Sequence, residues 1–114
     1  MPAVVHAGET LDSIYETQAK NCESLPCIRE EIDSINDKLL ALIVRRTAFV
    51  RRAGDLKKHS KIANDQKRVE DQLSVISEKS SKFGLPKEIS LETFKALINK
   101  SIEFEQKYID RNKG

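Results

Sequence analysis

The sequence predicts an all-α protein of three helices, the first much longer than the others. Apolar residues recur at spacings of three and four from residue 28 onward, and no segment alternates between polar and apolar residues. Charged residues make up 33% of the 114 residues and aromatic residues only 5%, a balance typical of long exposed helices. We therefore expect one helical domain over residues 23–114, preceded by a loosely ordered arm over residues 1–22.

The first helix is predicted to begin near Ser24 and to end at about Lys58. Ser24 can cap the first turn, and Pro26 is tolerated within that turn. The apolar face of the helix has a heptad-like spacing and consists of Ile28, Ile32, Ile35, Leu39, Leu42, Phe49, Ala53 and Leu56. At 1.5 Å per residue, such a helix is roughly 45 to 50 Å long. Because a small monomer cannot cover a rod of this length, the pattern favours a second chain.

Two shorter helices follow. Asn64 or Asp65 can cap the second helix, and Gly84 is expected to end it. Pro86 and Ser90 are start signals for the third helix. The apolar faces of these two helices consist of Val69, Leu73, Ile76 and Phe83, and of Leu91, Phe94, Ile98 and Tyr108.

Polar residues interrupt the apolar face of the first helix. Arg46 takes a position where the heptad spacing calls for an apolar side chain. Lys57 lies eleven residues further on, which places it about 20° from the same face and about 16 Å along the helix. Ala53 and Gly54 lie between them and are small enough to leave a hollow. This pattern indicates a pocket with a cation at each end.

The third helix shows the same kind of anomaly, because Ser101 and Glu105 occupy positions on its apolar face. A purely structural interpretation is a buried ion pair between Arg46 and Glu105 that fixes the register of the helices. Arg29 and Arg68 carry less information by themselves, since most arginines on helices are exposed to solvent. Periodicity alone leaves both interpretations open.

Several segments resemble the all-helical chorismate mutases, and the resemblance covers roughly Cys22 to Tyr108. The matching segments are Ile28–Asn36, Leu39–Leu42, Arg45–Arg46, Gly54–Lys57, Asp65, Arg68, Phe94 and Leu97–Ile102. The resemblance implies three helices per chain, with the long first helices paired across an intertwined homodimer. It also implies two active sites, each built from both chains.

The activity that the resemblance implies is the rearrangement of chorismate to prephenate in aromatic amino acid biosynthesis, without a cofactor. Arg46 and Arg68 would bind the carboxylates of the substrate, because the arginine fork matches a carboxylate. Arg29 would enter the site of the other chain. Lys57 would stabilise negative charge that grows on the ether oxygen as its bond to the ring lengthens.

Three more positions complete the implied site. Asp65 would hold the ring hydroxyl end through its backbone, and Ser101 would line the carboxylate region. Glu105 would lie opposite Lys57 at the ether oxygen. The implied catalytic residues are Lys57, Glu105 and Arg46. The rearrangement needs no nucleophile, metal or covalent intermediate, so that positioning and charge would supply the catalysis.

Departures from the family pattern leave two alternatives open. Val69 replaces a glutamate that accepts from the substrate hydroxyl in many mutases. The pair Arg68–Val69, the position of Cys22 and a segment from Lys57 to Arg68 that is one residue shorter are similar to the isochorismate-pyruvate lyases, which form salicylate and pyruvate. Glu105 favours the mutase, because the lyase pattern has glutamine there, although a glutamate can donate only when protonated. The other alternative is a non-catalytic helical dimerisation module.

The composition argues against several other functions. The chain has 20 Lys and Arg against 18 Asp and Glu, a net charge of +2 that gives little attraction for nucleic acid or anionic membranes. Cys22 and Cys27 lie far from His6 and His59 in the sequence and do not form a zinc pattern. No apolar run is long enough to cross a bilayer. Because the sequence shows no secretory signal, we expect free thiols and a cytoplasmic location.

Overall fold

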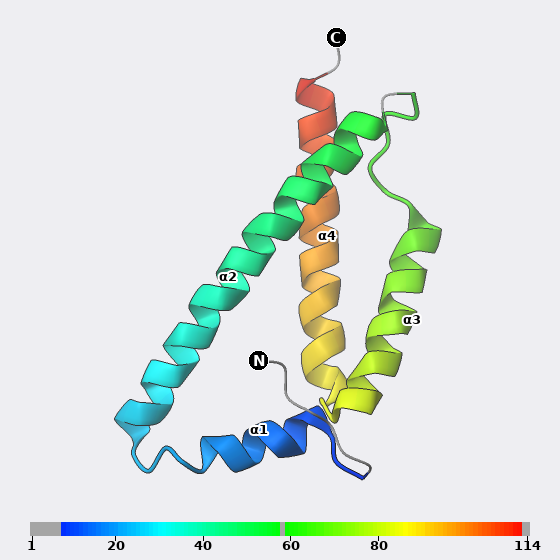
Figure 1. The fold of residues 1–114 in the computed structure, drawn as a ribbon. Helices are drawn as coiled ribbons and strands as arrows, with labels where there is room; N and C mark the ends of the chain where they lie inside the picture. Colours follow the sequence, from blue (N-terminus) through cyan, green and yellow to red (C-terminus); the bar gives the residue numbers. More distant parts are fainter. Residues whose placement is uncertain (1–7, 58, 113–114) are drawn as a thin grey trace.

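The computed structural model describes residues 8–57 and 59–112, and over these residues the fold is all-α, as predicted. The helices are α1 (Leu11–Ala19), α2 (Leu25–Leu56), α3 (Gln66–Phe83) and α4 (Lys87–Arg111). Helix α4 packs against both α2 and α3. Figure 1 shows that α2 crosses α4 near the C-terminal ends of both helices and then diverges from it, while α1 bridges the open end. The C-terminal half of α2 is therefore the part that faces the other helices.

Local signals position α2 and α3 as expected. The Ser24 hydroxyl accepts a hydrogen bond from the backbone N–H of Cys27 at 3.2 Å, which caps α2. Of the two cap candidates for α3, it is Asp65 that caps the helix. Gly84 ends α3 in the left-handed region, with φ at 77°, a conformation that glycine adopts without a steric penalty. Helix α2 ends at Leu56, close to the predicted end at Lys58, which lies outside the described residues.

The start of α4 differs in one detail from the prediction. The helix begins after Pro86 and has no side-chain cap. Ser90, expected as a start signal, is buried inside the helix, and its hydroxyl accepts a hydrogen bond of 2.6 Å from the Ser80 hydroxyl of α3. Because a buried hydroxyl needs a partner, this pair joins the two helices near the turn that connects them.

Helix α1 was not predicted, and the expectation of three helices is corrected to four over the described residues. Thr10 and Ser13 form a reciprocal capping box, in which each side chain accepts from the backbone N–H of the other residue. The helix has only nine residues and none of them is buried, so that it is too short for a repeated apolar pattern to reveal it. The part of the expected arm over residues 1–7 lies outside the described residues.

Cys22 and Cys27 are joined in a disulfide, and the prediction of free thiols is wrong. The first turn of α2, which Ser24 caps, brings the two Cα atoms to 5.5 Å, a separation suited to a disulfide. Since disulfides are rare in the cytosol, the bridge gives no support to the predicted cytoplasmic location. None of the helices in the described part of the chain is both long enough and apolar enough to span a membrane.

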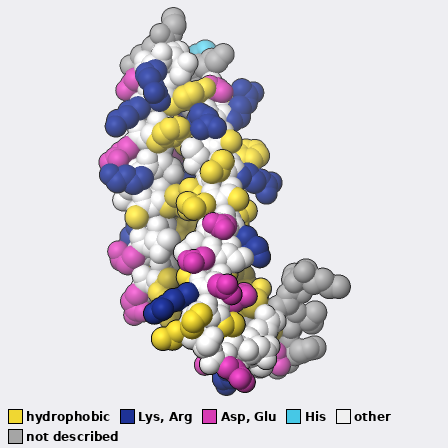
Figure 2. Space-filling model, turned by 90° about the vertical axis from the view of Figure 1, so that its left-hand side faces the viewer, with side chains coloured by type: hydrophobic (Ala, Val, Ile, Leu, Met, Phe, Trp, Pro, Cys, Tyr) yellow, Lys and Arg dark blue, Asp and Glu magenta, His cyan; other side chains and the backbone are white. Residues whose placement is uncertain are grey.

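The chain is unusually open for its size. It exposes 9193 Å² of surface, whereas a folded monomer of 12.9 kDa exposes about 6300 Å². Its radius of gyration is 17.9 Å, against about 13 Å for a compact chain of this length. Many large apolar side chains of α2 are exposed, and Figure 2 shows hydrophobic side chains uncovered on the side of the molecule where α2 lies. The exposed apolar residues of α2 include Ile32, Ile35, Leu39, Leu40, Leu42, Val44, Phe49 and Leu56.

Candidate active site

A cavity of about 280 Å³ lies between the C-terminal half of α2, the beginning of α3 and the middle of α4. Side chains from all three helices, and from the connection between α2 and α3, form its walls. Its apolar lining consists of Phe49, Val50, Ala53, Ala63, Val69, Ile98 and Ile102. Its polar lining consists of Arg46, Lys57, Asp65, Arg68, Gln72, Ser101 and Glu105. The cavity therefore contains six of the seven site residues expected from the sequence.

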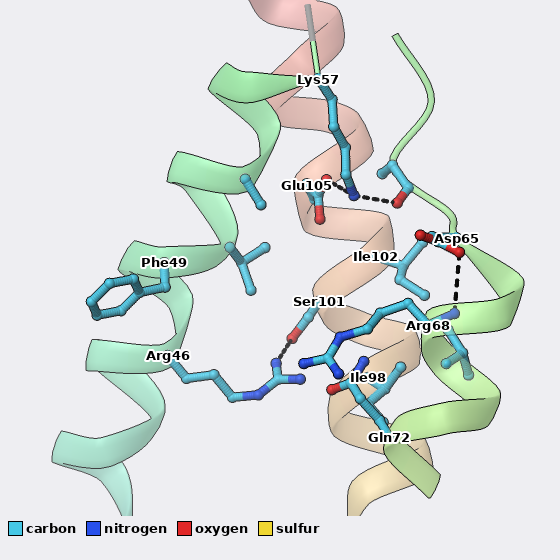
Figure 3. Close-up of a pocket in the computed structure, with 14 residues that line it drawn as sticks. Arg46, Phe49, Lys57, Asp65, Arg68, Gln72, Ile98, Ser101, Ile102 and Glu105 are labelled. Carbon is cyan, nitrogen blue, oxygen red and sulfur yellow. Dashed lines mark hydrogen bonds and ion pairs between the residues drawn. The ribbon is translucent and has the colours of Figure 1, made fainter. Parts of the chain in front are cut away.

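Arg46 marks one end of the cavity. Its Nη1 donates a hydrogen bond of 2.9 Å to the Ser101 hydroxyl across the gap between α2 and α4. Figure 3 shows the guanidinium reaching into the space between the helices. A buried ion pair between Arg46 and Glu105 was the structural alternative, and this pair is not formed among the described residues, because Glu105 instead pairs with Lys57. Among the described residues, the one hydrogen bond of the Arg46 side chain goes to a neutral hydroxyl, which does not neutralise the positive charge of Arg46.

Lys57 and Glu105 mark the other end. The Lys57 ammonium lies 2.8 Å from Oε2 of Glu105 and also donates to the Ala63 carbonyl at 2.8 Å. The Glu105 side chain is only 8% exposed, so that its charge needs this partner. An ammonium has three N–H donors, and the contacts in the described part of the chain use two of them. One donor of Lys57 is left for a ligand.

Gly54 has a different role from the one expected. Ala53 lines the cavity as predicted, whereas Gly54 is buried against α4. A Cβ atom at Gly54 would lie 3.1 Å from Cδ1 of Tyr108, 3.4 Å from Cγ1 of Ile109 and 3.5 Å from Cγ of Glu105. The glycine therefore lets α2 and α4 approach closely at the level of the Lys57–Glu105 pair, rather than widening the hollow.

A second polar contact joins α2 and α4 beside this glycine. The Tyr108 hydroxyl donates a hydrogen bond of 2.6 Å to Oδ1 of Asp55. This bond raises the pKa of Tyr108 above its ordinary value, because the neutral phenol is the form that donates to the carboxylate. The contact helps to fix the crossing of the two helices that hold Lys57 and Glu105.

Helix α3 supplies the remaining cation. Asp65 caps α3 by accepting from the backbone N–H of Arg68 at 3.1 Å. This capping bond starts the helix in a register that turns the Arg68 side chain into the cavity, where Figure 3 shows its guanidinium pointing toward Arg46. No side-chain partner neutralises Arg68 among the described residues. Gln72 also lines the cavity and was missed in the sequence, although its position one turn after Arg68 places it on the same face of α3.

Arg29 is the one expected site residue that is absent from the cavity lining in the described chain. It is exposed in the first turns of α2, and Arg46 follows 17 residues later. At 1.5 Å per residue, the two positions are about 25 Å apart along the helix. A single chain therefore does not bring Arg29 to the cavity.

The arrangement of charges suits a small anion. Two arginines and one lysine line the cavity against two carboxylates, and one of these carboxylates is already paired with Lys57. Over residues 8–57 and 59–112, no group of three or more His, Cys, Asp or Glu side chains could hold a metal ion. Fold and site together define a helical protein with a cation-lined pocket, whose charges match those of a small anion.

Comparison with known families specifies this class further. A family model described as chorismate mutase type II matches residues 28–106, which is more than half of the chain. The chain belongs to this family. The match includes every residue of the expected site, Arg29 among them. No curated protein and no solved structure matched the chain.

Proposed function

We propose that this protein is a chorismate mutase, which converts chorismate to prephenate as a homodimer without a cofactor. The observation that carries the proposal is that Arg46 and Lys57 line one cavity well apart from each other, while Arg68 extends from α3 toward Arg46 (Figure 3). Chorismate has two carboxylates, one on the ring and one on the enolpyruvyl arm, and an ether oxygen between these two parts. A cavity lined by these three cations offers a partner for each of these groups.

In the proposed reaction the ether C–O bond breaks while a C–C bond forms between the enolpyruvyl arm and the ring. The electrons move within the substrate, so that no nucleophile or external proton is consumed. Arg46 and Arg68 hold the two carboxylates and thereby fold the arm over the ring, which converts a flexible molecule into a reactive conformer. The free donor of Lys57 bonds to the ether oxygen, where negative charge grows in the transition state.

In this mechanism Glu105 acts through Lys57. Its carboxylate accepts a hydrogen bond of 2.8 Å from the ammonium, which fixes the direction of the lysine side chain. The resemblance placed Glu105 directly at the ether oxygen, a role that requires a proton on the carboxyl group. The ion pair instead supports a role in which Lys57 donates and Glu105 orients it.

The proposed homodimer rests on the open shape of the chain. The exposed apolar face of α2 continues beyond the region covered by α4, and the excess surface is of the size that an obligate interface buries. Arg29 lies on this uncovered part of α2. In the dimer, Arg29 from the second copy would add a fourth cation to the cavity, which it does not reach within its own chain.

An isochorismate-pyruvate lyase is the second candidate, and Val69 is the observation that favours it. Val69 lines the cavity and gives its wall no hydrogen-bond acceptor for a ring hydroxyl. Gln72, three residues further along α3, carries an amide that can accept or donate instead. The two substrates differ in where the ring hydroxyl lies, while both carry two carboxylates, so that the same cations would serve either reaction.

The test is to incubate the purified protein with chorismate and with isochorismate in separate reactions. Loss of chorismate absorbance with formation of prephenate would support the mutase. Salicylate fluorescence that appears only from isochorismate would assign the lyase instead. Thermal stability with and without each diacid is measured in parallel, since a ligand that binds only the folded state stabilises it. No stabilisation and no turnover with either compound would leave the non-catalytic dimerisation module as the better explanation.

A further inference from the structure

Gln106 of α4 binds two backbone groups of the connection between α2 and α3. Oε1 of Gln106 accepts from the backbone N–H of Ala63 at 2.9 Å, and Nε2 of Gln106 donates to the Lys61 carbonyl at 3.0 Å. A carboxamide has both a donor and an acceptor, which lets Gln106 bind both groups at once. Nε2 also lies 3.1 Å from Oδ1 of Asp110, one turn further along α4.

The segment that Gln106 holds is under conformational strain. Lys61 has a φ of 57°, in the left-handed region that residues other than glycine rarely adopt. Its backbone N–H donates to the Lys57 carbonyl at 3.0 Å, so that the chain reverses direction directly after α2. Such a conformation persists only where the surroundings enforce it. The bond from Gln106 to the Lys61 carbonyl is a contact that does so.

The same segment orients the Lys57 side chain. The carbonyl of Ala63 accepts from the Lys57 ammonium at 2.8 Å, and Ala63 is only 2% exposed. The N–H of Ala63 is the group that Gln106 binds, which fixes the residue on both sides of its backbone. Two consecutive residues of α4 thus act on one ammonium, Glu105 by direct contact and Gln106 through Ala63.

We infer that Gln106 is a positioning residue for Lys57: it holds residues 61–63 so that the Ala63 carbonyl directs the ammonium into the cavity. The inference rests on the proposed function for its effect on turnover, but the orientation of Lys57 can be measured separately. A purely structural role would stabilise the connection without any specific effect on Lys57. If Gln106 acts through Lys57, replacing Gln106 should have no further effect on turnover after Lys57 is removed. A purely structural effect of Gln106 should persist without Lys57.

The first test is a double-mutant cycle. Gln106→Leu retains the approximate size of the side chain and removes both hydrogen bonds, while Lys107→Leu at the neighbouring exposed position is the matched control. We expect Gln106→Leu to lower kcat at least tenfold and to change KM less than threefold, because the carboxylate partners are untouched. In a Lys57→Ala background, the same change should have little further effect on kcat. An equal loss of kcat in both backgrounds would overturn the inference.

Conservative rescue provides a further check. Gln106→Glu retains the acceptor for the Ala63 N–H but loses the donor to the Lys61 carbonyl, and its kcat should fall between those of the wild type and Gln106→Leu. A glutamate variant no better than the leucine variant would argue against the proposed contacts. If Gln106→Leu does not fold, Gln106→Glu takes its place in the double-mutant cycle with Lys57→Ala.

An independent readout does not depend on turnover. In the wild type, the hydrogen-bonded ammonium of Lys57 should give a protected side-chain ¹⁵N signal in NMR spectra, and Gln106→Leu should broaden or abolish this signal while other signals of the fold remain. Retention of the signal in the variant would overturn the inference. Absence of turnover in the wild type together with the expected loss of protection would overturn only the proposed function.

Discussion

Replacement of Glu105 tests the link between the fold and the candidate site. Glu105→Leu leaves the Lys57 ammonium without its carboxylate partner, and Glu105→Gln leaves it with a neutral acceptor. The Glu105 side chain is 8% exposed and that of Lys57 is 31% exposed, which places the pair between a surface pair and a buried one. We therefore expect a loss of about 2 kcal/mol of unfolding free energy for the leucine variant and about 1 kcal/mol for the glutamine variant.

Thermal unfolding followed by circular dichroism measures this difference. A loss of 1 kcal/mol lowers Tm by about 4 °C in a domain near this size, so the leucine variant should melt about 8 °C below the wild type and the glutamine variant about 4 °C below it. All proteins are compared at one protein concentration, since association also shifts Tm. Glu103→Gln, at an exposed position of the same helix, is the control. A leucine variant as stable as the wild type would refute the ion pair as a stabilising contact.

Three further predictions follow from the proposed dimer and from the crossing of α2 and α4. Leu39→Lys, at an apolar position that is 50% exposed, should shift the protein toward monomer in analytical ultracentrifugation, and an unchanged mass would contradict the interface. Mixing Arg29→Ala chains with Arg46→Ala chains after joint refolding should recover activity, because one site of each mixed dimer is intact; no recovery would argue against shared sites. The pKa of Tyr108 is raised, so its contribution to stability should be present below the ordinary value of about 10 and lost as the pH rises through the raised value. In thermal unfolding, Tyr108→Phe should reduce this loss of stability at alkaline pH. An identical loss in the variant would show that Tyr108 does not cause it.

The helices that the sequence predicts correctly have strong local signals. Ser24, Asp65 and Gly84 cap their helices in the expected places because capping depends only on a few neighbouring residues. Helix α1 has a capping box of the same local kind, yet its nine residues are too few for a repeated apolar pattern to be recognised. The Cys22–Cys27 disulfide was missed for a different reason, since the prediction relied on the cell compartment rather than on the geometry of the turn.

The candidate site was predictable where it interrupts an apolar face. Arg46 and Glu105 were identified because a charged residue in a buried register is unusual, and both line the cavity. Their partners were not predictable from spacing, because the relative shift of α2 and α4 along their axes decides which side chains meet. Gln106 gave no sequence signal, since its partners are backbone groups of a connection whose path is set by tertiary contacts. The homodimer remains a prediction that rests on the uncovered face of α2.

The rate at which Lys57→Ala converts chorismate to prephenate tests the central claim most directly. Removal of a donor aimed at charge that develops in the transition state costs roughly 100- to 1000-fold in kcat. We expect a loss of that size relative to the wild type, while Lys79→Ala, at an exposed position of α3, retains full activity. A Lys57→Ala protein that forms prephenate within threefold of the wild-type rate would contradict the proposed site.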